Sequence, residues 1–173
     1  RTCIPASTAM MMNFIARRDL NLGQMAILRY AQPRDALNDA TQRGSDPLGW
    51  SRAATYYSRY TGRPTTYRWE AYSTASAALR RAARQIAVTK KPVGLLAGHG
   101  RHAMVMTGFV ATANPAHAST WTLSSIWVSD PYGYSRRSYA ATSTPLNTYL
   151  ETDASDWYDR QWYGKYIVIV PQG

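Results

Sequence analysis

Residues 3–15 read CIPASTAMMMNFI, and this stretch contains Cys3, the only cysteine of the 173-residue chain. Pro5 suits the first turn of a helix, where its missing N–H costs nothing. Met10, Phe14 and the Met11/Ile15 pair lie at helical spacing and predict a buried stripe. A cysteine at a helix N-terminus faces unpaired N–H groups and the positive end of the helix dipole, and both favour the thiolate. The stretch therefore predicts a helix that begins beside a reactive cysteine.

Two later motifs supply partners for such a thiolate. Residues 98–108 read GHGRHAMVMTG, in which His102 leads into an apolar strand, and residues 127–133 read WVSDPYG, in which Asp130 closes another strand. A nucleophile, a base and a carboxylate that orients the base form the triad of nucleophilic hydrolases. Cys3, His102 and Asp130 are therefore the candidate catalytic residues.

Each candidate also has a plainer interpretation. Cys3 could be a small buried hydrophobe, His102 a hydrogen-bonded core histidine, and Asp130 a turn residue before a proline. His99, three residues before His102, is a competing base. It lies in the turn formed by Gly98, His99 and Gly100, where we expect it to be exposed or to line a cleft. His117 lies in a predicted hairpin loop and is expected to be exposed. The three histidines lack metal-ligand spacing, so the sequence predicts neither a metal site nor a cofactor.

The composition indicates a globular protein of one domain, residues 1–173. Apolar residues make up 45% of the chain and charged residues 17%. No apolar run approaches the roughly 18 residues that a membrane span needs. The single cysteine excludes an internal disulfide framework. The sequence begins with Arg1 rather than methionine, which suggests a removed upstream segment and, together with the aromatic-rich composition, a secreted or cell-surface location.

The chain is strongly basic, with a net charge of +10, and all but three of its twenty basic residues are arginine. Such a surface attracts polyanions, among them nucleic acid, anionic cell-envelope polymers and acidic substrates. The charges are scattered and no basic run reaches five residues, so most are expected to lie on solvated faces. No nucleic-acid-binding motif accompanies them. The tyrosine and tryptophan pairs are expected in the core and at its rim.

The order of predicted elements indicates an α+β protein, with helices first and an antiparallel sheet afterwards. A helical lobe is expected over about residues 1–91 and a sheet lobe over about residues 92–173. Helices are predicted over residues 5–17, 21–31, 35–42, 48–60, 73–88 and 146–151, strands over 65–72, 93–97, 102–111, 120–128 and 166–170, a hairpin turn at 114–116, and an aromatic loop or short helix over 153–163.

Three motifs together resemble those of papain-like cysteine peptidases, most closely the bacteriocin-processing type and its free-standing secreted bacterial relatives. They are the Cys-Ile-Pro-Ala-Ser start at Cys3, the Pro92-Val93 strand followed by Gly-Arg-His-Ala-Met-Val-Met-Thr-Gly at residues 100–108, and Asp130-Pro131. The resemblance implies a papain-like fold in which the catalytic helix packs on an antiparallel sheet. It also implies hydrolysis of a peptide or protein substrate through a thioester acyl-enzyme.

By this resemblance, Cys3 is the nucleophile, His102 the general base and later the acid, and Asp130 the residue that orients the imidazole. The family also has a glutamine shortly before the cysteine, which helps to form the oxyanion hole. Only Arg1 and Thr2 precede Cys3 in this sequence, and Gln24 and Gln32 both follow it. The glutamine therefore belongs to an upstream segment or is missing.

Two alternatives to an active peptidase follow from the same features. One is a catalytically impaired papain-like module that binds an anionic polymer or a protein partner. The other is a cell-wall amidase or endopeptidase, for which a basic surface would aid attraction to an anionic envelope.

Overall fold

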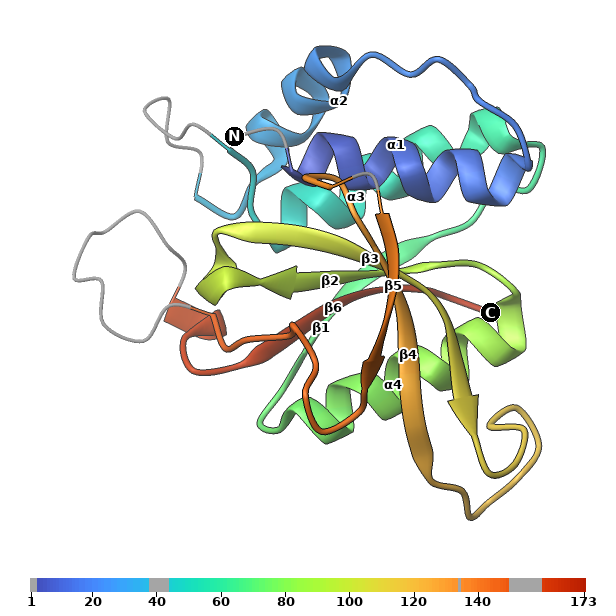
Figure 1. The fold of residues 1–173 in the computed structure, drawn as a ribbon. Helices are drawn as coiled ribbons and strands as arrows, with labels where there is room; N and C mark the ends of the chain where they lie inside the picture. The colour runs from blue at the N-terminus through green and yellow to red at the C-terminus, as the bar shows by residue number, and fades with distance from the viewer. Residues whose placement is uncertain (1–2, 38–43, 134, 150–159) are drawn as a thin grey trace.

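The computed structural model describes residues 3–37, 44–133, 135–149 and 160–173 (Figure 1). The helices and strands, in chain order, are α1 (Cys3–Ala16), α2 (Gln24–Ala31), η1 (Gln32–Arg34), α3 (Pro47–Tyr57), η2 (Ser58–Thr61), β1 (Tyr67–Tyr72), α4 (Ala75–Thr89), β2 (Val93–Ala97), η3 (Gly98–Gly100), β3 (His102–Ala111), β4 (Leu123–Asp130), β5 (Ser135–Ala140), η4 (Arg160–Trp162) and β6 (Tyr166–Pro171). The six strands form one sheet in the order β1-β6-β2-β3-β4-β5, and every neighbouring pair is antiparallel. The predicted α+β class is confirmed.

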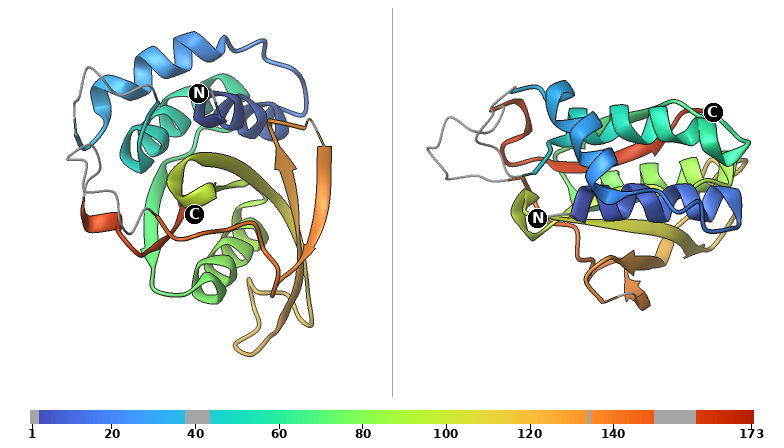
Figure 2. Two further views of the ribbon diagram at one scale, coloured as in Figure 1. Left: turned by 60° about the vertical axis from the view of Figure 1, so that its left-hand side comes forward. Right: turned by 90° about the horizontal axis from the view of Figure 1, so that it is seen from above.

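The sheet separates two hydrophobic cores. Helices α1, α2 and α3 lie across one face and α4 lies on the other (Figures 1 and 2). Because side chains alternate along a strand, β6 supplies both cores. Ile167 and Ile169 pack toward the three-helix side, and Val168 and Val170 pack toward α4. A strand that is apolar at every position is thus explained by burial on both faces.

Local signals set the helix starts. Asp46 caps α3, since its carboxylate accepts a hydrogen bond from the Gly49 N–H at 2.9 Å, and Pro47 occupies the first helical position. Thr74 caps α4 by accepting from the Ala77 N–H at 3.2 Å. These caps place the helices within one or two residues of the predicted starts at 48 and 73.

The predicted stripe on α1 is partly wrong. Met11, Met12 and Ile15 are buried, whereas Phe14 is 45% exposed. The buried face of the helix runs through Ile4, Met11 and Ile15, so Phe14 lies beside that face rather than on it.

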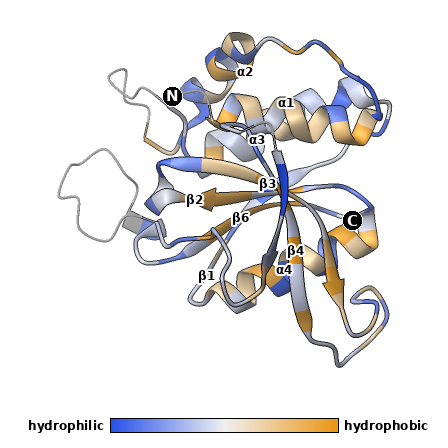
Figure 3. Ribbon diagram, in the orientation of Figure 1, coloured by the Kyte–Doolittle hydropathy of each residue, from blue (hydrophilic) through white to orange (hydrophobic). Residues whose placement is uncertain are grey.

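The second half of the chain differs from the sequence-based prediction at two places. The predicted helix at 146–151 is absent from its described part, where Leu146, Thr148 and Tyr149 form isolated β-bridges. The sequence does not predict β5, because its segment SRRSYA lacks the apolar alternation that indicates a strand. This strand lies at the sheet edge and is largely hydrophilic (Figure 3).

The remaining predicted elements are present with shifted ends, and strands β2 and β3 have the predicted bounds. Of the predicted helix at 35–42, residues 35–37 form a bend and the rest lies outside the described residues. Of the aromatic segment at 153–163, only residues from 160 onward are described, and they begin with the short helix η4. The sheet also takes in β1, through β6, from the part of the chain expected to form the helical lobe. No helix in the described ranges is long and apolar enough to cross a membrane.

Candidate active site

Cys3 is held at the start of α1, beside the beginning of β3. It is half-buried, and its Sγ lies 3.9 Å from the carbonyl oxygen of Arg101. One helical turn later, the buried Ser7 hydroxyl donates to the carbonyl oxygen of Ala103 at 3.0 Å. This bond joins the first turn of α1 to the second residue of β3. It therefore fixes the position of the thiol relative to His102.

His102 and Asp130 meet because their strands pair in one register. Val105 of β3 lies opposite Ser129 of β4, so alternation turns His102 and Asp130 toward the same face of the sheet. The His102 Nε2 lies 2.9 Å from the Asp130 Oδ1. Their side chains are 19% and 25% exposed, respectively, so the pair is partly shielded from water.

The two ring nitrogens of His102 have different environments. Nε2 contacts the carboxylate, which favours a proton on that nitrogen. Nδ1 is buried and has no hydrogen-bond partner among the described residues. In free enzymes a catalytic hydrogen bond is often long and tightens only when substrate is bound. Nδ1 is therefore the nitrogen available to exchange a proton with the Cys3 thiol.

The pKa values of this pair move in the directions that a thiolate–imidazolium pair requires. Burial raises the pKa of the Cys3 thiol, but the interaction with the His102 imidazole and its positive charge outweighs burial and holds that pKa below its ordinary value. The pKa of His102 is raised, chiefly by the interaction with Cys3 and further by Asp130. These two interactions together outweigh desolvation, which lowers the pKa. Each shift favours the charged form of its group, the thiolate of Cys3 and the imidazolium of His102.

Tyr132 is a site residue that sequence reasoning missed. Its backbone N–H donates to the same Asp130 Oδ1 at 2.9 Å, and its ring centroid lies 5.1 Å from that of His102. The side chain is 78% exposed, so the ring covers the imidazole from the solvent side without belonging to the core. The signal in the sequence was the Asp-Pro-Tyr turn itself, because an aspartate commonly accepts from the N–H two residues later.

The other two histidines are not brought to this site. His99 is exposed, as is His117 in the hairpin loop, which agrees with the prediction for each. His99 lies in a turn where Gly98, His99 and Gly100 all have positive φ. Gly100 is needed there because a Cβ would lie 2.8 Å from the Tyr149 ring, which packs against this turn. The turn thereby delivers the chain into β3 at His102.

The start of α1 provides one candidate donor for an oxyanion hole. The first N–H groups of a helix have no partner within it, so the backbone N–H of Cys3 is placed to donate. Neither of the two glutamines named above supplies a side-chain donor at the thiol, since Gln24 is exposed at the start of α2 and the Gln32 amide donates to the Gly44 carbonyl oxygen at 3.0 Å. The residues that precede Cys3 lie outside the described ranges.

Within those ranges no group of three His, Cys, Asp or Glu side chains is arranged to hold a metal ion. The arrangement instead brings together a thiol, an imidazole and a carboxylate. Comparisons of this chain with protein-family models, with curated proteins and with solved structures find no match.

Proposed function

We propose that this protein is a cysteine peptidase with a papain-like arrangement, in which Cys3, His102 and Asp130 form the catalytic triad. The observation that carries the proposal is the 2.9 Å contact between His102 Nε2 and Asp130 Oδ1, which leaves Nδ1 for a thiol at a helix start. The opposite pKa shifts of Cys3 and His102 support the same assignment.

The proposed reaction begins with the Cys3 thiolate and the protonated His102. The sulfur attacks the carbonyl carbon of the peptide bond, forming a C–S bond, and the carbonyl π electrons move to the oxygen. As the carbonyl re-forms, the C–N bond breaks and His102 Nδ1 gives its proton to the departing amine. The product of this step is a thioester, and the amine leaves.

Water then completes hydrolysis. Neutral His102 takes a proton from a water molecule whose oxygen attacks the thioester carbonyl carbon. The C–S bond breaks, the acid is released, and the thiolate–imidazolium pair is restored. Asp130 keeps the ring oriented through both steps and favours its positive charge.

The rate depends on how the oxyanion is stabilised. The backbone N–H of Cys3 is one donor, and loss of a second donor costs roughly 10²- to 10³-fold in rate.

The test is the rate of iodoacetamide modification of Cys3 as a function of pH, which reports the thiolate and needs no known substrate. We expect a thiol pKa well below the free value of about 8.5 in the unaltered protein. In His102→Ala it should rise toward or above that value, because burial then acts without the imidazole. His99→Ala is the matched control, since it removes a histidine three residues away and should change nothing.

A thiol pKa near the free value, with the same profile in His102→Ala, would overturn the proposal. A low pKa that changes only in His99→Ala would transfer the base role to His99. Hydrolysis of a fluorescent peptide library, abolished by Cys3→Ala, is the measurement that follows a positive result.

A further inference from the structure

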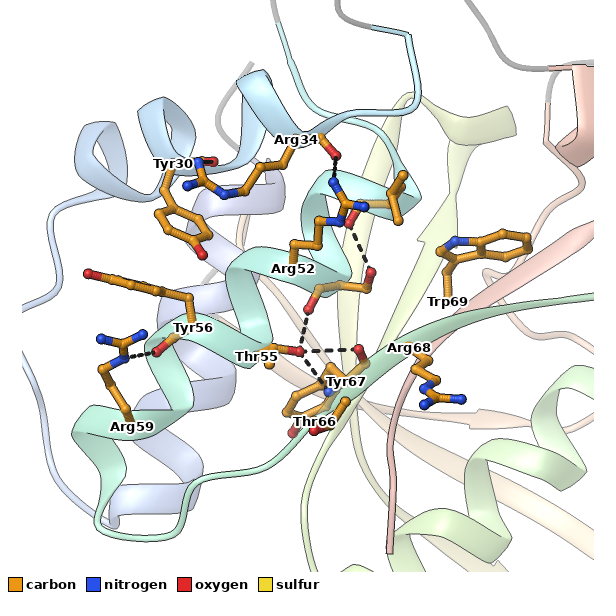
Figure 4. Close-up of a pocket in the computed structure, with 12 residues that line it drawn as sticks. Tyr30, Arg34, Arg52, Thr55, Tyr56, Arg59, Thr66, Tyr67, Arg68 and Trp69 are labelled. Atoms are coloured by element: carbon orange, nitrogen blue, oxygen red, sulfur yellow. Dashed lines mark hydrogen bonds between the residues drawn. The ribbon is translucent and has the colours of Figure 1, made fainter.

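The structure assigns a second site, an arginine-lined hollow that binds a linear phosphate polymer. The hollow has a volume of about 750 Å³ and is lined by parts of α2, η1, α3, η2 and β1 (Figure 4). Four arginines line it, Arg34, Arg52, Arg59 and Arg68, and no acidic residue does. None of Cys3, His102 and Asp130 is among the lining residues, so the site is separate from the proposed active site.

The positive charge of this hollow is not neutralised within the described part of the chain. There, none of the four guanidinium groups forms an ion pair with a carboxylate. Three of them are instead anchored by carbonyl oxygens. Arg34 donates to Tyr30 at 2.9 Å, Arg59 to Tyr56 at 3.1 Å, and Arg52 to Arg34 at 3.2 Å. A guanidinium has five N–H donors, so each group retains donors for a ligand.

A stacked column holds two of these guanidiniums in place. Cζ of Arg34 lies 3.8 Å from the centroid of the Tyr30 ring, and Cζ of Arg59 lies 3.8 Å from that of Tyr56. The two rings stack on each other at 4.1 Å with an angle of 29°. Figure 4 shows the order Arg34, Tyr30, Tyr56, Arg59 along the column. Stacking and the carbonyl bonds order both side chains before any ligand arrives, which lowers the entropy cost of binding.

The chemistry of the hollow favours phosphate groups in series. Arginine donates two parallel hydrogen bonds to phosphate oxygens, and four such groups along one open hollow suit a chain of anions better than a single ion. Single-stranded nucleic acids are bound largely by stacking of bases on aromatic rings. Here Arg34 and Arg59 already cover the outer faces of the stacked tyrosines, and Trp69, which also lines the hollow, is engaged in an edge-to-face contact with Trp162. The hollow therefore favours a phosphate chain without bases.

The experiment is fluorescence anisotropy of labelled short-chain inorganic polyphosphate with the full chain, over a range of salt concentrations. The double variant Arg34→Gln/Arg59→Gln should weaken binding by roughly tenfold or more and reduce the salt dependence. The matched control is Arg18→Gln/Arg84→Gln, which removes the same charge from exposed arginines outside the hollow and should change affinity by less than about twofold.

Arg68→Gln covers the case in which the double variant fails to fold. Arg68 is exposed on β1 and also lines the hollow, so its loss should weaken binding while the melting temperature stays constant. Equal weakening by the control pair would show attraction to net charge only and would overturn the proposal. Tighter binding of single-stranded DNA or of polyglutamate at equal charge would overturn the choice of a phosphate chain.

The two proposals can fail independently. Cys3→Ala should bind polyphosphate as the unaltered protein does, and Arg68→Gln should retain the low thiol pKa. Loss of polyphosphate binding in Cys3→Ala would contradict the separation of the two sites.

Discussion

At the scale of single residues, Asp130 shows how one carboxylate serves two purposes. Its Oδ1 accepts from both His102 Nε2 and the Tyr132 backbone N–H, each at 2.9 Å. The first contact orients the imidazole and raises its pKa, and the second fixes the turn that carries the covering tyrosine ring. In the proposed triad, His102 depends on the negative charge of Asp130 and on the hydrogen bond that Asp130 accepts. Substitutions at Asp130 can separate these two contributions.

Replacing Asp130 by alanine should lower activity on the order of 10²-fold or more, because the imidazole loses both its orientation and its counter-charge. The sign of the pH effect follows from the charge. Without the carboxylate the His102 pKa falls, so the alkaline limb of the pH–rate profile moves to lower pH. The measurement is kcat/KM for a peptide substrate against pH, or the alkylation profile of Cys3 where turnover is too slow.

Asp130→Asn is the matched control for this prediction. An amide oxygen can still accept both hydrogen bonds, so orientation is retained while the charge is lost. We expect a smaller decrease in activity with the same downward shift of the alkaline limb. Equal activities of the alanine variant and the unaltered protein would exclude Asp130 from the site.

At the scale of elements, the position of α1 on the sheet sets the distance between the Cys3 thiol and the His102 imidazole. Buried Ser7 reaches across to Ala103, one residue beyond His102, whereas buried Thr8 donates to the Ile4 carbonyl oxygen within its own helix at 2.8 Å. Two neighbouring hydroxyls thus have different tasks. One joins α1 to β3, and the other is satisfied locally.

Ser7→Ala should cost about 1 kcal/mol of unfolding free energy and also decrease kcat, because α1 can shift relative to β3. Thr8→Val removes a buried hydroxyl from the same helix and should lower stability. It should not shift the Cys3 thiol pKa, whereas Ser7→Ala should. Urea unfolding and the alkylation profile distinguish these outcomes. Equal shifts of the thiol pKa in both variants would show that the Ser7 bond does not position the nucleophile.

The start of α3 contains a buried pair of carboxyl groups. Burial raises the pKa of Asp46, and the hydrogen bonds that it accepts from the backbone N–H groups of Gly49 at 2.9 Å and Ala36 at 2.6 Å oppose this rise. Asp35 has one buried oxygen, Oδ2, with no partner among the described residues. Burial, followed by the nearby charge of Asp46, raises the pKa of Asp35 to about 8. The proton of the pair therefore resides on Asp35 at neutral pH.

This pair should make the protein less stable as the pH rises. The folded state holds a proton that the unfolded chain releases near pH 4, so the stabilising effect is present at acid pH and is lost between about pH 4 and pH 8. Asp35→Asn carries no titrating proton and should flatten this dependence. The check is urea unfolding at pH 5 and pH 9, with the exposed Asp19→Asn as the control. An unchanged difference between the two pH values in Asp35→Asn would contradict the assignment.

At the scale of the whole molecule, the two-sided sheet depends on close approach at its centre. Gly94 of β2 faces the fully buried Trp50 of α3, and a Cβ at that position would lie 2.6 Å from the indole ring. Trp50 belongs to the core on the three-helix face that also contains Ile4 of α1. A larger side chain at position 94 would therefore also disturb the packing of α1, the helix that begins with Cys3.

Gly94→Ala should lower the free energy of unfolding by about 1–3 kcal/mol, because the indole must shift within a filled core. Gly44→Ala is the control, since no atom of the described residues lies within 4 Å of the position of its Cβ. Thermal unfolding of both variants makes the comparison. A Gly94→Ala protein as stable as the control would show that the core on this face has room for a methyl group.

The sequence by itself determined the α+β class, strands β2 and β3 with their bounds, and the identity of the three residues proposed for catalysis. These features depend on the local periodicity of apolar residues and on reactive side chains next to glycine or proline. Both can be read from a few neighbouring positions of the sequence. The sequence could not supply β5, because an edge strand with polar side chains has no alternation to detect. It also could not exclude Phe14 from the buried stripe, because the buried face of a helix is chosen by the partners that pack on it.

Only the tertiary structure decided which distant groups meet. It separated His102 from His99 through the register of β3 against β4, and it added Tyr132 as the cover of the imidazole. It also gathered Arg34, Arg52, Arg59 and Arg68, which lie in different elements, into one hollow. Charges that are scattered along the chain can converge in space, since antiparallel pairing and helix packing join residues far apart in sequence.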